Sequence, residues 1–94
     1  MNRDQLLTRF RHLSQLEPKF TMKALTAKQT VTVLIRHGFS FSRNKGSHEI
    51  YRNNQTGISV PVPFHAGNKP IHIGTFLAIV RQSKIPKKKF GKNL

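Results

Sequence analysis

One short stretch of the sequence concentrates side chains that can transfer protons and bind phosphate. From Arg43 on, it reads Arg-Asn-Lys-Gly-Ser-His-Glu-Ile-Tyr-Arg. Arg43 and Lys45 supply positive charge, and Gly46 lets the backbone approach a phosphate closely. The Ser47 hydroxyl and the turn amides can bind an oxyanion, while the imidazole of His48 titrates near neutral pH. These groups suit cleavage of RNA by its own 2′-hydroxyl, which needs a base, an acid and cations but no metal.

The composition favours a polyanionic partner and removes several other chemistries. The 94 residues include 17 Lys and Arg but only three acids, a formal net charge of +14, which favours nucleic acid as the partner. Asp4, Glu17 and Glu49 are too few for the carboxylate cluster of a metal-dependent nuclease. Without cysteine the chain has no thiol nucleophile and no cysteine zinc site. We therefore expect no metal and no cofactor.

The same residue types also have ordinary structural explanations. Turns collect Gly, Ser, Asn and Lys. His37 would cap the end of a helix, and His72 would precede another helix. Lys69 would be solvated, although it could extend a phosphate-binding surface, and His65 lies in a loop that could return toward the Gly46 turn. Spacing alone therefore leaves open a binding module without catalysis.

The sequence predicts one small α+β domain at residues 25–85, with the element order α-β-β-β-α. The run Thr26-Ala27-Lys28-Gln29 has the capping-box pattern, and an apolar face then predicts a helix that reaches His37. A second helix is expected to begin near Gly74 and to end near Ser83. The two helices pack most simply on one face of a three-stranded antiparallel sheet.

Three strands are predicted between the helices, where apolar residues begin to recur at every second position. The first contains Phe39 and Phe41, the second spans residues 48–53, and the third contains Ile58, Val60 and Val62. Prolines at positions 61 and 63 cannot donate to a ladder, so the third strand should lie at an edge. In the second strand, His48 shares a face with Ile50 and Arg52, and Tyr51 lies on the other face. Because both faces hold an apolar residue, alternation does not show which one meets the helices.

Two segments flank the predicted domain. Residues 1–24 place leucines and Phe10 at helical spacing, which predicts an additional amphipathic helix from about Asp4 to Glu17. Residues 86–94 carry four lysines and are predicted to form a flexible basic tail. No run is long enough to cross a membrane, and the amino terminus lacks the apolar stretch of a signal peptide. We therefore expect a cytoplasmic protein.

Three short motifs follow one another along the predicted domain. The first is a helix that ends in His37-Gly38-Phe39, and the second is Arg43-x-Lys45-Gly46-Ser47-His48-x-Ile50-Tyr51. The third is Val60-Pro61-Val62-Pro63-x-His65, with Gly74-Thr75 and a closing helix after it. Together they resemble the HicA family of toxin ribonucleases. The resemblance implies a fold similar to that of double-stranded-RNA-binding domains.

The resemblance also implies an activity, a partner and site residues. It implies an endoribonuclease toxin that cleaves mRNA, part of a stress response, and a HicB-like antitoxin that neutralises it. His48 matches the family's active-site histidine, whereas Glu49 stands where the family commonly has a second one. The residues expected to contact RNA or phosphate are Arg43, Lys45, Gly46, Ser47, Arg52, His65 and Lys69. The alternatives are a non-catalytic RNA-binding module of the same fold and a DNA-binding protein.

Overall fold

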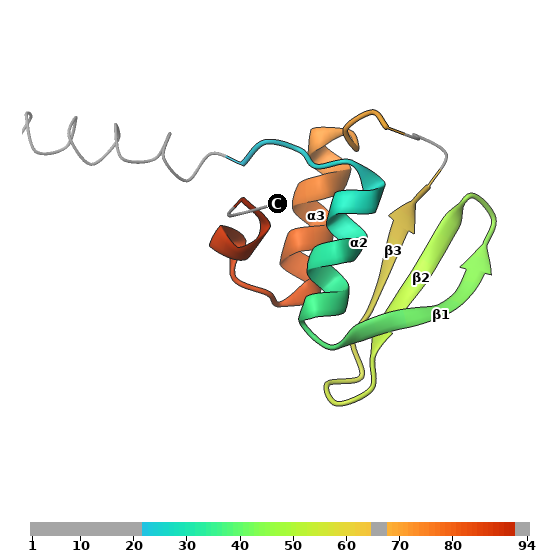
Figure 1. Cartoon of the computed structure of the whole chain (residues 1–94). Coiled ribbons are helices and arrows are strands. Elements are labelled where there is room, and N and C mark those ends of the chain that lie inside the picture. The colour runs from blue at the N-terminus through green and yellow to red at the C-terminus, as the bar shows by residue number, and fades with distance from the viewer. Residues whose placement is uncertain (1–21, 65–67, 92–94) are drawn as a thin grey trace, which may run out of the picture.

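The computed structural model describes residues 22–64 and 68–91, and its elements follow the predicted order (Figure 1). They are helix α2 (Ala27–Arg36), strands β1 (Phe39–Lys45), β2 (His48–Asn53) and β3 (Ser59–Pro63), helix α3 (Ile73–Ser83) and a short 3-10 helix, η2 (Lys87–Phe90). The additional helix predicted from Asp4 to Glu17 lies outside the described residues. No helix within the described ranges is long and apolar enough to cross a membrane.

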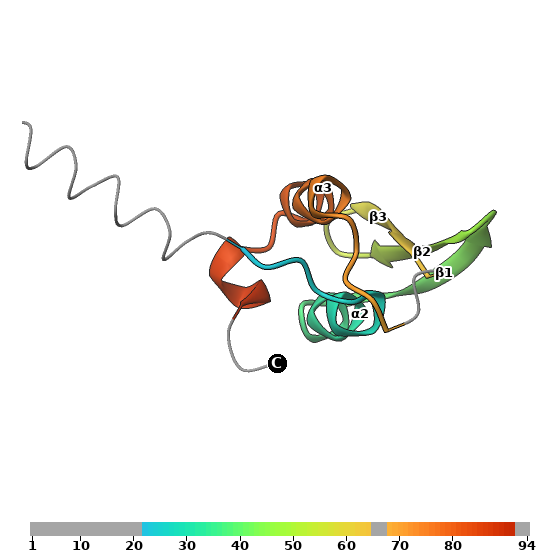
Figure 2. The same ribbon diagram turned by 90° about the horizontal axis from the view of Figure 1, so that it is seen from above.

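The three strands form one antiparallel sheet in the order β1-β2-β3. Strand β3 therefore lies at an edge, as its prolines predicted. Both helices lie on the same side of the sheet and leave its other face uncovered (Figure 2). The turn of the β1–β2 hairpin projects beyond the helices (Figure 1). The predicted α+β fold, with two helices on one face of a three-stranded sheet, is confirmed.

Helix α2 begins and ends at the predicted signals. The Thr26 hydroxyl accepts a hydrogen bond from the Gln29 amide, and the Gln29 side chain accepts one from the Thr26 amide, both at 3.1 Å. At the other end, the Nδ1 of His37 lies 2.9 Å from the Val33 carbonyl oxygen. Because a carbonyl only accepts, this nitrogen carries the proton. His37 is thus a helix cap, and Gly38 follows it with a φ of +90°.

The hydrophobic core lies between the helices and the inner face of the sheet. Leu34 of α2, Phe76 of α3, and Val60 of β3 are each 0% exposed. Tyr51 of β2 belongs to this cluster, whereas Ile50 lies outside it. The packing thus resolves what alternation left open: the Tyr51 face of β2 meets the helices. His48, Ile50 and Arg52 therefore lie on the outer face of the sheet.

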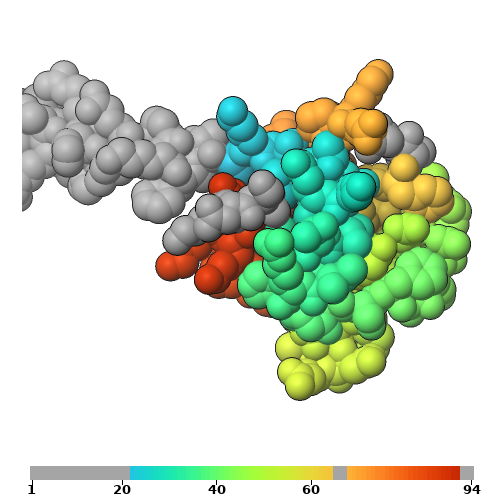
Figure 3. Space-filling model, in the orientation of Figure 1, coloured from blue at the N-terminus to red at the C-terminus, as the bar shows by residue number. Residues whose placement is uncertain are grey.

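Residues 86–91 differ from the flexible tail that was predicted over residues 86–94, and residues 92–94 lie outside the described residues. Lys87–Phe90 form η2, which lies beside α2 (Figure 3), and Phe90 is 0% exposed. Its ring and that of Phe76 form an edge-to-face pair with the centroids 5.8 Å apart and the planes at 87°. The lysines of η2 remain exposed. One apolar residue among lysines produces no periodicity, so the pattern did not reveal this anchor.

Candidate functional site

An irregularity in β1 decides which way its basic side chains face. Phe41 pairs with Tyr51, but the next pair joins Arg43 to Ile50, so Ser42 is an extra residue that forms a β-bulge. In a regular ladder, Ser42 would stand opposite Ile50 and Arg43 would face the helices. The bulge instead places Arg43 on the outer face.

The next pair of residues whose side chains face outward lies at the end of the β1–β2 hairpin. Lys45 pairs directly with His48, and residues in such pairs have Cβ atoms about 5 Å apart. Gly46 and Ser47 form the turn between them, and Gly46 has a φ of +60°, which suits the first central residue of a type II′ turn. Arg43, Lys45 and His48 thus gather on one face near the free end of the hairpin.

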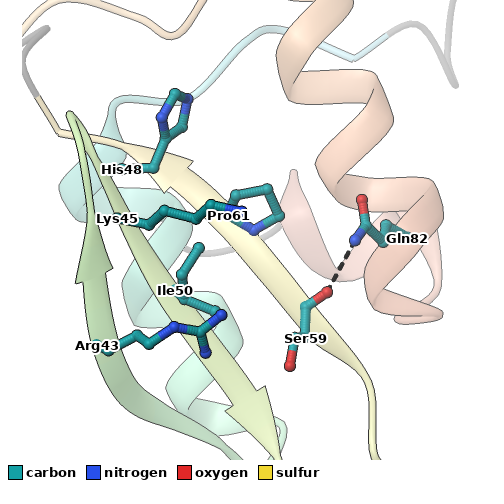
Figure 4. Close-up of a pocket in the computed structure, with 7 residues that line it drawn as sticks. All are labelled: Arg43, Lys45, His48, Ile50, Ser59, Pro61 and Gln82. Carbon is teal, nitrogen blue, oxygen red and sulfur yellow. Dashed lines mark hydrogen bonds between the residues drawn. The ribbon is translucent and has the colours of Figure 1, made fainter.

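These three side chains border a shallow hollow of about 430 Å³ on the outer face (Figure 4). Its lining comes from all three strands and α3: Arg43, Lys45, His48, Ile50, Ser59, Pro61 and Gln82. Ile50 is buried and Pro61 is half-buried, so the centre of the hollow has an apolar floor. The basic side chains lie on exposed positions, and His48 is half-buried. An imidazole beside two cations can act on a bound phosphate diester.

Glu49, the one acid among residues 22–64 and 68–91, lies on the opposite face of β2. Its Oε1 accepts a hydrogen bond from the Tyr51 hydroxyl at 3.0 Å. Burial, this hydrogen bond and the negative charge of the carboxylate together raise the pKa of Tyr51 to about 12. Among the described residues, no carboxylate therefore shares the outer face with Arg43 and Lys45.

Several residues predicted to contact RNA do not line the hollow. Arg52 is on the outer face, but its guanidinium donates to the Gly57 carbonyl at 3.2 Å and does not line the hollow. Gly46, Ser47 and Lys69 are exposed outside its lining. His65 lies outside the residues that the structure describes. Of the predicted set, the structure brings together Arg43, Lys45 and His48.

His72 has a structural role, as expected from its place before the second helix. It is the N-cap of α3, and its Nδ1 accepts a hydrogen bond from the Gly74 amide at 3.2 Å. In the part of the chain that the structure describes, no three His, Cys, Asp or Glu side chains are grouped as a metal site would need.

The sequence did not single out the α3 contribution to the hollow. The Nε2 of Gln82 donates to the Ser59 carbonyl at 2.8 Å and so joins α3 to the edge of β3. These residues are 23 positions apart, and no periodicity connects them. A polar residue in the last turn of a helix normally indicates a solvated position, so only the tertiary packing reveals that Gln82 belongs to this site.

A family model described as "HicA toxin of bacterial toxin-antitoxin" matches residues 27–85. The chain belongs to the HicA toxin family. The match begins with α2 and ends before η2, so it contains every residue of the hollow but excludes Phe90. No curated protein matches the chain. Membership of the HicA toxin family gives the chain a toxin role in a bacterial toxin–antitoxin pair, and such a pair implies an antitoxin partner.

Proposed function

We propose that this HicA toxin is an endoribonuclease that cleaves mRNA by attack of the RNA's own 2′-hydroxyl, without a metal. The observation that carries the proposal is the hollow bordered by Arg43, Lys45 and His48, with Glu49 on the opposite face. The two cations hold the phosphate, since charged donors bind its oxygens strongly. They also stabilise the negative charge that builds up as the attack proceeds.

The reaction requires two proton transfers at the phosphate. The 2′-oxygen loses its proton and bonds to the adjacent phosphorus, while the bond from phosphorus to the 5′-oxygen breaks and that oxygen gains a proton. His48 transfers one of these protons, as general base or general acid, and solvent water carries the other. The products are a 2′,3′-cyclic phosphate and a 5′-hydroxyl end.

The charge of the molecule supports the partners in this proposal. A formal net charge of +14 attracts RNA, and it equally attracts an acidic protein. A HicB-like antitoxin with an acidic surface would inhibit the toxin by covering the hairpin turn and His48. In this proposal the toxin acts on mRNA in the cytoplasm until the antitoxin binds it.

The first test changes the substrate. An RNA with a single 2′-deoxy sugar at the cut site lacks the attacking oxygen, so we expect it to resist cleavage while the unmodified RNA is cut. The measurement is gel analysis of end-labelled oligonucleotides, with chemical identification of the new ends. Equal cleavage of both substrates would show that the 2′-hydroxyl is not the nucleophile.

The second test changes the protein. His48→Ala should abolish cleavage but retain RNA binding, because Arg43 and Lys45 remain in place. His72→Asn is the matched control: asparagine still caps α3 and the position is outside the hollow, so cleavage should stay at the wild-type level. A wild type that binds RNA but cuts none would indicate the non-catalytic module. Stronger binding to duplex DNA than to RNA would indicate a DNA-binding protein.

A further inference from the structure

Phosphate binding alone does not explain why the floor of the hollow is apolar. Ile50 is 6% exposed although it lies on the outer face, away from the core cluster, and Pro61 stands opposite it in β3. Phosphate oxygens gain nothing from contact with these hydrocarbon surfaces. Ile50 is already shielded from water, but Pro61 is only half-buried, so a flat ligand with apolar faces gains from covering the exposed part of its ring, because that removes apolar surface from water.

Gln82 adds a hydrogen-bonding edge to this floor. Its side chain reaches from α3 to the Ser59 carbonyl at the edge of β3, as Figure 4 shows. Because that carbonyl only accepts, the amide nitrogen must point toward it, which fixes the orientation of the amide. One N–H is thereby used, and the second N–H and the Oε1 atom remain. The hollow thus presents one donor and one acceptor side by side, next to an apolar surface.

The basic side chains complete the set of contacts. Arg43 pairs with Ile50, which in turn pairs with Pro61, so its guanidinium lines the hollow beside the apolar floor. A guanidinium plane can stack on a base, and unpaired bases in RNA are bound by such stacking together with hydrogen bonds to their edges. Lys45 and His48 border the same hollow, so the phosphate of that nucleotide would lie beside them.

We propose that the hollow is a subsite for one unpaired nucleobase, with Ile50 and Pro61 as its floor and Gln82 as the residue that reads the base edge. This inference rests on the proposed function, because it names the substrate class as single-stranded RNA. A paired base would have its Watson–Crick edge occupied, whereas an unpaired base offers a donor and an acceptor to the amide. The toxin would thus prefer one base at a fixed position next to the cut.

The experiment measures base preference by binding, separately from cleavage. Short single-stranded RNAs are made resistant by 2′-O-methyl groups, and each position next to the cut site is occupied in turn by each of the four bases. We expect wild type to prefer one base at one position by about tenfold, as for a good amide–base contact. Gln82→Ala should reduce that preference to about twofold or less. Gln55→Ala, which changes an exposed glutamine in the β2–β3 turn, should leave it intact.

Each other result has a distinct meaning. Cleavage of RNA with no base preference in wild type, or a preference that survives in Gln82→Ala, would overturn the subsite and leave the nuclease standing. Failure of wild type to bind or cut any RNA would overturn the proposed function and the subsite with it. If Gln82→Ala weakens binding of an acidic peptide while the base preference stays intact, the hollow belongs to a protein partner instead.

Discussion

Replacing Phe90 with alanine tests whether the C-terminal segment is part of the folded domain. The side chain is fully buried and its ring packs against Phe76, which is also 0% exposed. Helix η2 follows the end of the family match, and its other three residues are lysines with exposed side chains. The stability of η2 therefore depends on one aromatic anchor.

The expected loss follows from the degree of burial. Truncation of a fully buried phenylalanine to alanine costs about 3–5 kcal/mol in free energy of unfolding, from lost transfer energy and the remaining cavity. At this site η2 can also detach from the domain, and detachment would return the conformational entropy of its residues. The lower end of the range, about 3 kcal/mol, is therefore expected. That is a large part of the 5–15 kcal/mol typical of a whole domain.

Urea denaturation followed by circular dichroism measures this loss directly. Lys88→Ala is the matched control: it changes an exposed residue in the same turn of η2, and surface substitutions usually stay within about 0.5 kcal/mol. A loss below about 1 kcal/mol for Phe90→Ala would refute the reasoning. The segment would then contribute no more than a solvated tail, as its composition alone suggested.

Two further predictions concern the hairpin turn and the tyrosine. Gly46→Ala should lower the free energy of unfolding, measured in urea, by about 1 kcal/mol. Its φ of +60° strains alanine, although a Cβ at this position would meet no atom within 4 Å. The control is Gly91→Ala, which is equally open but has a φ of −110° and should cost nothing. Equal losses at both glycines would contradict this. The sole tyrosine, Tyr51, should ionise near pH 12 in an ultraviolet titration. The free energy of unfolding should fall as the pH rises from 10 through 12, because the unfolded chain loses its phenol proton at a lower pH than the folded chain does. Tyr51→Phe should remove that decline, and a wild-type midpoint near 10 would contradict the burial argument.

Local signals in the sequence were sufficient to predict most of the fold. The capping box at Thr26 and the change of period after Gly38 depend on neighbouring residues, so they can be recognised without knowledge of the packing. Local signals could not predict which face of β2 meets the helices. Both Ile50 and Tyr51 are buried, one under the hollow and the other in the core, so only the packing distinguishes them.

The candidate site was predictable where its residues are close in sequence. Arg43, Lys45 and His48 lie within six positions of one another, so their residue types alone predicted them as one group. Their common face was not predictable, because it depends on the bulge at Ser42. Gln82 was missed because its contact with β3 spans 23 positions, and contacts of that range leave no periodic signal.

The extra residue in β1 has a consequence for the comparison of related chains. An alignment that places a toxin with an unbulged first strand beside this one, without a gap at Ser42, would match side chains that point to opposite sides of the sheet. Equivalent cations would then look like substitutions, and unrelated positions would look shared. A single-residue gap at Ser42 restores the correspondence. The insertion or loss of one amino acid there can therefore leave the outer face of the sheet unchanged while it changes the numbering of every residue that follows.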